Sequence, residues 1–262
     1  MSTALIDADI VNFQSAAAAQ RDYGDEMWVD ASKALADAVD QIDEQVEAAE
    51  CTDIILCYSP KNGTNFRKKL FTEYKANRKK KPKPVCYYDL RDELEKRYTH
   101  KSIDWLEADD LMGLLSGKIE DSVIISIDKD MECVPATIMN PMKHVWPVEI
   151  TEHKANYNHL YQTIIGDTTD NYKGIKGVGP KGAQALLSEF YSLKIDDDGT
   201  HIDNFDLEGA VKAVKNLYTM KGQDDFLQQA RVARILRPGE FDFKTNEIKL
   251  WNPDGDYDTL KV

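Results

Sequence analysis

The stretch Val123-Ile-Ile-Ser-Ile127, which runs directly into Asp128-Lys-Asp130, decides how this 262-residue chain is interpreted. A short run of β-branched apolar residues is typical of a strand buried on both faces. The two aspartates are two positions apart at the end of this strand, so their carboxylates project to the same side. The N-terminus repeats the arrangement, because Ala4-Leu-Ile6 ends at Asp7. The sequence therefore predicts two buried strands that each end in acids.

Strands and helices alternate around these two segments. Helical spacing of apolar residues is found over 28–49, 87–98 and Glu107–Ser116, and strands are predicted at Ile54–Cys57 and Ser102–Leu106. Such alternation indicates an α/β fold with a mostly parallel central sheet and flanking helices. Ligands of parallel sheets bind beyond the carboxyl ends of the strands, so Asp7 and Asp128 are expected to converge.

The chain becomes mostly helical after residue 150. Helices are predicted at about 154–166, 180–190, 208–220 and 223–236, with a polar loop over 195–206. Phe241–Trp251 alternates around Thr245-Asn246 and is predicted to form a terminal hairpin. We therefore expect a core over 1–150, a helical region over 151–240, and a hairpin or tail over 241–262.

Two further acidic clusters are Glu107-Ala-Asp109-Asp110 and Asp167-Thr-Thr-Asp170. Each alone has an ordinary explanation, such as charge on the first turn of a helix, a capped turn, or a solvated loop. Together with the two strand ends they are harder to explain by solvation, because crowded carboxylates repel one another unless a cation lies between them. Oxygen ligands in this number suit two Mg²⁺ or Mn²⁺ ions, an arrangement that serves phosphodiester hydrolysis.

A glycine-rich turn, Gly174-Ile-Lys176-Gly177-Val-Gly179-Pro180-Lys181, follows the last acidic cluster. Gly177 and Gly179 predict a tight turn, and Pro180 suits the first position of a helix. The backbone amides of such a turn and the helix N-terminus bind anions. With Lys176 and Lys181 alongside, the pattern indicates a helix-hairpin-helix at about 160–190 that holds a DNA backbone without reading its sequence. A purely structural connection between helices is the alternative.

The net charge of −13 hides a strongly basic segment. Residues 61–83 contain ten basic side chains and one acid, Glu73, so they carry +9 and leave −22 for the rest of the chain. Phe71 and Tyr74 lie among these cations, and aromatic rings can stack on unpaired bases while cations follow phosphates. A lysine run is otherwise usually a solvated segment. Its prolines argue against one continuous helix.

Composition limits the class of protein. The hydrophobic content of 42% and the charged content of 30% are ordinary for a globular chain. The absence of an 18-residue apolar run and of a signal peptide predicts a cytoplasmic protein, in the host cytoplasm if a phage encodes it. The four cysteines show no CxxC pairing and are expected to be reduced thiols.

In their order, these motifs resemble those of the flap endonuclease and 5′→3′ exonuclease family, especially its short phage members. The matching motifs span roughly residues 4–237 and are Leu5-Ile-Asp7; Arg67 with Glu73-Tyr74-Lys75-x-x-Arg78; Glu107-Ala-Asp109-Asp110; Ser126-Ile-Asp128-Lys-Asp130; Ile165-Gly-Asp167-x-x-Asp170-Asn; the glycine-rich turn; and Gln229-Ala-Arg231-x-x-Arg234-Ile-Leu-Arg237-Pro. The resemblance implies a PIN-like sheet, a helical arch at about 64–100 and the helix-hairpin-helix. It further implies an enzyme that cuts duplex DNA near 5′ ends, nicks or flaps, in replication and primer removal or in DNA degradation.

The resemblance also implies a role for each matching residue. The metal ligands would be Asp7, Glu107, Asp109, Asp128 and Asp130, with Asp110 adjacent and with Asp167 and Asp170 completing the second site. Lys75 and Arg78 would act on the scissile phosphate. The expected DNA contacts are Arg67, Tyr74, Lys79, Lys80, Lys81, Lys83, Lys176, Gly177, Gly179 and Lys181. Two Mg²⁺ (or Mn²⁺) ions, K⁺ at the helix-hairpin-helix, RNA–DNA hybrids as a second substrate, and a monomer are further expectations.

One position departs from the family pattern, which usually has an aspartate at the end of the second strand. Here Ile54–Cys57 runs into Tyr58-Ser59-Pro60, and we expect water or a neighbour such as Asp9 to substitute. Two other functions stay open. Asp7-Ala-Asp9 matches haloacid-dehalogenase-type phosphatases, with Asp7 as the nucleophile, although the basic segment and the glycine-rich turn are then unused. The absent aspartate also allows a catalytically inactive DNA-binding module.

Overall fold

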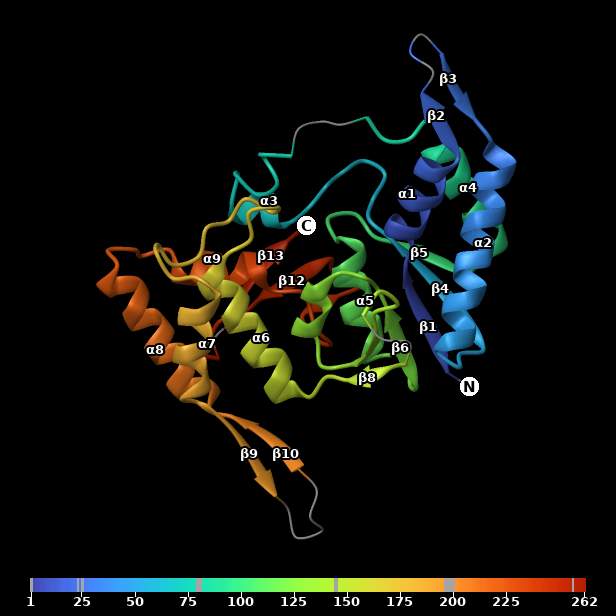
Figure 1. Cartoon of the computed structure of the whole chain (residues 1–262). Coiled ribbons are helices and arrows are strands. Elements are labelled where there is room, and N and C mark those ends of the chain that lie inside the picture. The colour runs from blue at the N-terminus through green and yellow to red at the C-terminus, as the bar shows by residue number, and fades with distance from the viewer. Residues whose placement is uncertain are drawn as a thin grey trace. The chain divides into compact units, whose positions relative to one another are not determined.

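The computed structural model describes residues 2–22, 24, 26–78, 82–143, 146–195, 201–255 and 257–262 (Figure 1). The chain forms two compact units. The first comprises Met1–Thr64, Lys80–Lys129 and Ala136–Glu149, and the second comprises Asn65–Lys79, Asp130–Pro135 and Ile150–Val262. No helix in the described part of the chain is long and apolar enough to cross a membrane.

The first unit is built on a six-stranded sheet in the order β5-β4-β1-β6-β7-β8. Its strands are β1 (Thr3–Asp7), β4 (Asp53–Tyr58), β5 (His100–Ser102), β6 (Ser122–Ile125), β7 (Thr137–Met139) and β8 (Val148–Glu149). Every pairing is parallel except that of β7 with β8. The predicted mostly parallel sheet is therefore confirmed, and β1 lies between β4 and β6 at its centre.

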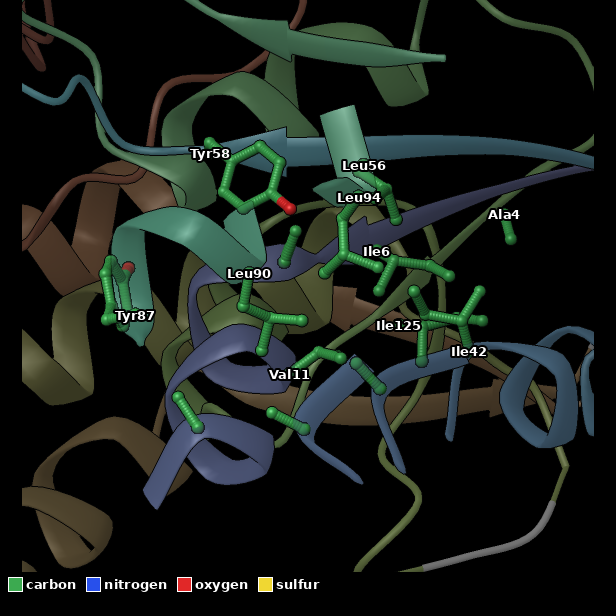
Figure 2. Packing of buried hydrophobic residues seen from close by; sticks show 14 of the residues in the cluster. Ala4, Ile6, Val11, Ile42, Leu56, Tyr58, Tyr87, Leu90, Leu94 and Ile125 are labelled. Atoms are coloured by element: carbon green, nitrogen blue, oxygen red, sulfur yellow. The ribbon is translucent and has the colours of Figure 1, made fainter. Parts of the chain in front are cut away.

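Four helices pack with this sheet: α1 (Ala8–Ala18), α2 (Ala31–Ala48), α4 (Tyr87–Arg97) and α5 (Ala108–Ser116). Figure 2 shows the apolar cluster that joins β1, β4 and β6 to α1, α2 and α4; its labelled members are Ala4, Ile6, Val11, Ile42, Leu56, Tyr58, Tyr87, Leu90, Leu94 and Ile125. The strand predicted at Ser102–Leu106 is displaced, because β5 ends at Ser102.

The helix predicted to start at residue 28 begins only at Ala31. Asp30 caps it by accepting a hydrogen bond from the Lys33 amide, so an acid rather than the preceding tryptophan sets the boundary. Trp28 instead lies in β3 (Met27–Val29), which pairs with β2 (Gln20–Asp22). Helix α1 was not predicted from the sequence, because its alanines give weak apolar periodicity.

The second unit is mainly helical. Its helices are α3 (Arg67–Leu70), α6 (Glu152–Ile165), α7 (Pro180–Ser188), α8 (Leu207–Met220) and α9 (Phe226–Ala233), and Lys129–Cys133 form a 3-10 helix that enters it. The core is formed by apolar residues of α6 to α9 with Trp251. The four helices predicted after residue 150 are confirmed.

Two small sheets complete this unit. The predicted terminal hairpin is confirmed as β11 (Phe241–Asp242) with β12 (Glu247–Leu250), and β13 (Asp258–Lys261) adds a third strand. The prediction of a polar loop at 195–206 is wrong for part of its length. Residues 191–195 form β9 and 201–205 form β10, an antiparallel pair, while 196–200 lie outside the described residues. Phe205 is buried at the end of β10 beside Tyr191, which explains why so polar a segment pairs.

Candidate active site

Asp7 is buried at the carboxyl end of β1, in the first unit. Ser126 Oγ donates a hydrogen bond to Asp7 Oδ2 at 3.1 Å. Ser126 Oγ also accepts a hydrogen bond from the Asp128 amide at 3.1 Å. Ser126 therefore links the segment that carries Asp128 to Asp7. Burial, and then the charge of Asp9, raises the pKa of Asp7 to about 7, with a smaller contribution from Asp128. The expected convergence of the two strand ends is thus observed.

Asp9, on the first turn of α1, lies at the carboxyl end of β4, where the sequence lacks an acid. Its Oδ2 accepts the Ser59 amide at 2.9 Å, and its Oδ1 accepts the Tyr87 hydroxyl at 3.1 Å. Burial raises the pKa of the Cys57 thiol, and the charges of Asp7, Asp109 and Asp9 raise it further. These three carboxylates are therefore neighbours at one edge of the sheet.

Helix α5 brings the second acidic cluster to this edge. The Ala108 amide donates to Ser59 Oγ at 3.2 Å, which fixes the start of α5 at the end of β4. Glu107 and Asp110 form a capping box, in which the Glu107 amide donates to Asp110 Oδ2 at 3.2 Å. Asp110 is fully buried, and its side chain caps the N-terminus of α5. Glu107 and Asp109 are half-buried.

The donor set of the first unit fits a hard divalent cation. All candidate donors are carboxylates, and the raised pKa of Asp7 shows that the protein alone does not stabilise its negative charge. Within the ranges that the structure describes, no three His, Cys, Asp or Glu side chains lie close enough to form a complete metal-binding group. Carboxylate oxygens are the donors that hard divalent cations such as Mg²⁺ prefer.

In the second unit, Asp170 is held by three predicted functional residues. Tyr74 OH donates to Asp170 Oδ2 at 2.9 Å, and Arg78 Nη2 donates to Asp170 Oδ1 at 2.7 Å. Lys75 Nζ lies 3.7 Å from Asp170 Oδ2, and the Lys75 amide donates to the Asp170 carbonyl at 2.8 Å. Lys75 has a left-handed φ of 56°, so this contact requires an uncommon backbone conformation. The two predicted catalytic cations thus share one carboxylate.

Asp130 and Asp167 also lie near Asp170. Gln162 Nε2 donates to Asp130 Oδ1, and Asp167 Oδ1 accepts the Thr169 amide at 2.6 Å. Burial raises the pKa of Tyr172 well above its usual range, and the charges of Asp130, Asp167 and Asp170 are among the further causes. The charges of these three predicted metal ligands therefore all act on one buried phenol in the second unit.

The glycine-rich turn lies between α6 and α7 and is braced by Gln223. Gln223 Nε2 donates a hydrogen bond to the Gly174 carbonyl at 3.0 Å, and Gln223 Oε1 accepts a hydrogen bond from the Lys176 amide at 2.7 Å. Gly177 has a φ of 76°, so glycine is required there, whereas Gly179 has a φ of −101° that any residue adopts. Both glycines are exposed, as are Lys176 and Lys181.

Two residues predicted to contact DNA are instead buried. Arg67 Nε donates to the Val232 carbonyl at 3.0 Å and its Nη2 donates to the Arg234 carbonyl at 2.6 Å, so its guanidinium supports α9 and the segment after it. Tyr74 packs in a cluster with Tyr172 and Val232 and uses its hydroxyl on Asp170. Both predictions are corrected for the same reason, since each side chain is buried and makes its contacts within the protein. Lys79, Lys80 and Lys81 lie outside the described residues.

Comparison with known proteins agrees with this geometry. Residues 2–158 match the model of the 5′-3′ exonuclease N-terminal resolvase-like domain. The chain belongs to the 5′-3′ exonuclease family. It is 32% identical to the exonuclease of Escherichia phage T7, with 95% of this chain and 93% of the relative aligned, and 29% identical to the exodeoxyribonuclease of Enterobacteria phage T3, with 95% and 92% aligned.

The fold of this exonuclease-family chain is also found in solved structures. The phage T5 D15 protein co-crystallised with metal ions superposes with a TM-score of 0.60 at 17% identity, covering 89% of each chain. The catalytic core of Rad2 in complex with DNA substrate superposes with a TM-score of 0.52 at 16% identity, covering 97% of this chain and 84% of that one. The fold is therefore the PIN-like fold of flap endonucleases, and the protein is an enzyme, a 5′ nuclease.

Proposed function

We propose that this 5′ nuclease is a metal-dependent 5′→3′ exonuclease and flap endonuclease that hydrolyses phosphodiester bonds near the 5′ ends of duplex DNA. The observation that carries the proposal is the meeting of Asp7, Asp9 and Asp128 at the carboxyl edge of the parallel sheet. Ligand sites in such sheets lie at this edge. The names of the phage relatives support the reaction, and the T5 enzyme, whose structures include a complex with DNA and metal ions, supports the substrate.

Each unit contains carboxylates that we propose as ligands of Mg²⁺ or Mn²⁺, with two ions in all. The residues proposed as ligands are Asp7, Glu107, Asp109 and Asp128 in the first unit and Asp130, Asp167 and Asp170 in the second. When bound, the ions supply a deprotonated water and charge neutralisation for the leaving oxygen. Asp9 is proposed as the acid that replaces the aspartate usual in the family at the end of β4, because Tyr58-Ser59-Pro60 contains no acid and Asp9 Oδ2 accepts the Ser59 amide. Asp110 is proposed to act indirectly, by fixing the first turn of α5.

Lys75 and Arg78 are proposed to act on the scissile phosphate. Both cations now neutralise Asp170. A carboxylate that binds a divalent cation attracts them less, which leaves their donors to orient the phosphate and to stabilise the negative charge that develops on it. The hydrogen bond from the Lys75 amide to the Asp170 carbonyl does not involve the carboxylate, so it can keep the lysine beside Asp170 in either case.

The glycine-rich turn is proposed to hold the duplex backbone through its amides, as a helix-hairpin-helix does, with K⁺ as an associated ion. Lys176 and Lys181 would add charge that is independent of base sequence. RNA in RNA–DNA hybrids is proposed as a second substrate, and the working state is proposed to be a cytoplasmic monomer. The regions 64–100, 151–240 and 241–262 are proposed to act as arch, DNA-binding region and tail.

Cleavage of 5′-labelled blunt, nicked and flapped duplexes with Mg²⁺ or with EDTA tests the proposal. We expect Mg²⁺-dependent release of 5′-phosphorylated products, and Asp128→Asn should abolish release while retaining DNA binding in EDTA. Duplex binding without release from any substrate would favour the inactive module. Family membership leaves no support for the phosphatase, and hydrolysis of a small phosphomonoester that beryllofluoride blocks would be needed to revive it.

A further inference from the structure

An exposed aromatic ring lies next to the acidic edge of the first unit, at the start of α4. Tyr87 is buried; its hydroxyl donates to Asp9 Oδ1 at 3.1 Å, and its carbonyl accepts Asn12 Nδ2 at 2.9 Å. The next residue, Tyr88, is 47% exposed. The two ring centroids are 5.2 Å apart at an interplanar angle of 83°. Tyr88 therefore stands against a ring that itself contacts the acidic site.

The ammonium group of Lys83 lies near the rings of both Tyr87 and Tyr88. Lys83 Nζ lies 3.8 Å from the centroid of Tyr87 and 5.1 Å from that of Tyr88. Cation–π contacts of this kind hold the ammonium group near the rings, and those of its three N–H donors that do not face a ring can bind an anion. An exposed aromatic ring beside a lysine is the combination that binds single-stranded nucleic acid, since the ring stacks on a base and the cation pairs with a phosphate.

Tyr74 and Tyr88 differ in their exposure to solvent. The aromatic ring that the sequence singled out for base stacking is buried and hydrogen-bonded to Asp170. Tyr88, by contrast, is exposed, and neighbouring Val85 is 63% exposed and tied by its amide to Gln20 Oε1 at 3.0 Å. The first unit thus has an aromatic surface beside its acids that the proposed chemistry does not use.

We propose that Tyr88 and Lys83 form a subsite for one unpaired nucleotide of the 5′ strand, with its base on the Tyr88 ring and a phosphate at the Lys83 ammonium. The inference rests on the proposed function for the identity of the substrate. The exposed ring offers a face to one base, and the ammonium group offers a partner to one phosphate. The subsite gives the enzyme a hold on a 5′ flap beside the metal ligands.

Fluorescence of 2-aminopurine tests the stacking without any turnover. The base is placed in turn at each unpaired position of a 5′ flap, and the complex is formed in EDTA. Stacking quenches 2-aminopurine, so wild type should show quenching that peaks at one position. Tyr88→Ala should remove that peak, Tyr88→Phe should keep it, and Lys83→Ala should weaken flap binding with less effect on blunt duplex. Trp146→Ala, which alters an aromatic ring 62% exposed on the same unit, should change nothing.

An abasic nucleotide at the quenched position gives a matched control on the DNA side. On intact flaps Tyr88→Ala should bind roughly tenfold more weakly than wild type, in line with the usual contribution of one stacked base. On the abasic flap the two proteins should bind equally, because the base that Tyr88 contacts is gone. An equal loss on intact and abasic flaps would show that Tyr88 supports only the fold, and would overturn the proposal.

These experiments distinguish a failure of the nucleotide subsite from a failure of the proposed nuclease function. If wild type binds flaps with the quenching peak but never cleaves, the subsite stands and the nuclease proposal fails. If wild type cleaves and Tyr88→Ala leaves the quenching pattern unchanged, the nuclease stands and the subsite fails. Equal binding of the abasic flap by Tyr88→Ala and wild type shows that the loss in the alanine variant is not a folding defect, and retained quenching in Tyr88→Phe shows that the aromatic ring is what matters.

Discussion

At the scale of single residues, the proposed role of Asp9 is to replace the carboxylate that the end of β4 lacks. Asp9→Asn keeps an oxygen for the Ser59 amide but removes the charge, so we expect Mn²⁺ affinity and turnover to fall by roughly 10- to 100-fold. Adding Ser59→Asp to Asp9→Ala returns a carboxylate to the end of β4 and should recover part of both. Asp53→Asn, at the opposite end of the same strand, is the matched control. Calorimetric titration of Mn²⁺ and flap cleavage measure the effects, and unchanged values in Asp9→Asn would remove Asp9 from the site.

Lys75 is the residue whose charge should matter most to the rate. Lys75→Ala removes a cation 3.7 Å from Asp170, and we expect kcat to fall by roughly 10²- to 10³-fold, as for other donors aimed at developing charge. DNA affinity in EDTA should change little, because phosphate contacts elsewhere are kept. Single-turnover cleavage measures the rate, with exposed Lys68→Ala as the control. A loss of affinity at an unchanged rate would reduce Lys75 to a tether.

At the scale of elements, the two glycines of the turn before α7 should behave differently. Gly177→Ala forces a side chain into a left-handed conformation at a cost of about 1 kcal/mol, which distorts the amides proposed to hold DNA. Gly179→Ala meets no neighbour within 4 Å and has an ordinary φ, so it is the matched control. We expect severalfold weaker duplex binding for Gly177→Ala and no change for Gly179→Ala, measured by anisotropy in EDTA. Short single strands should bind both variants alike.

Helix α6 carries a buried histidine that should make stability depend on pH. His159 Nε2 donates to the Ala230 carbonyl at 2.8 Å, and burial, together with Arg234 and Arg237, holds its pKa well below 6.5. The unfolded chain therefore binds more protons below pH 6.5, so this contribution is complete above that pH and is lost as pH falls, by up to about 1.4 kcal/mol per pH unit. Urea unfolding at pH 7.5 and 5.5 should show a smaller pH effect in His159→Gln. Equal effects in both proteins would mean that the His159 ring binds protons equally in the folded and unfolded states.

The elements also show what the sequence can and cannot predict. The strands β1, β4 and β6 were predictable because they are short apolar runs, as expected of strands buried on both faces, and the helices α6 to α9 were predictable because their apolar periodicity reflects which face is buried. Helix α1 and strand β10 were not predictable from the sequence. Helix α1 is rich in alanine and has weak apolar periodicity, and β10 is a polar segment in which Phe205 is buried. For the site, motif order located the acids, but the burial of Arg67 and Tyr74 depends on contacts with residues about a hundred or more positions away. No local pattern contains that information.

At the scale of the whole molecule, the excess of acid is itself a stability problem that cations should relieve. The chain carries −13 at pH 7, and Asp7 is buried near two further acids. We expect Mn²⁺ at about 100 times its dissociation constant to stabilise the fold by about 2.7 kcal/mol, which is roughly 5 °C or more in Tm. EDTA should reverse the shift. Differential scanning fluorimetry with and without the ion measures it.

Asp128→Asn tests whether Mn²⁺ stabilises the fold through the carboxylates at the sheet edge. The variant should raise the Tm measured without metal and reduce the gain in Tm that Mn²⁺ produces. Without metal it should melt at a higher temperature than wild type, since one repelling charge near Asp7 is gone while the Asp128 amide contact with Ser126 is kept. With Mn²⁺ its gain in Tm should be much smaller, because a ligand is missing. Asp53→Asn should leave both values as in wild type. An equal Mn²⁺ shift in wild type and Asp128→Asn would mean that the ion binds elsewhere, and that the carboxylates at the sheet edge do not form the metal site.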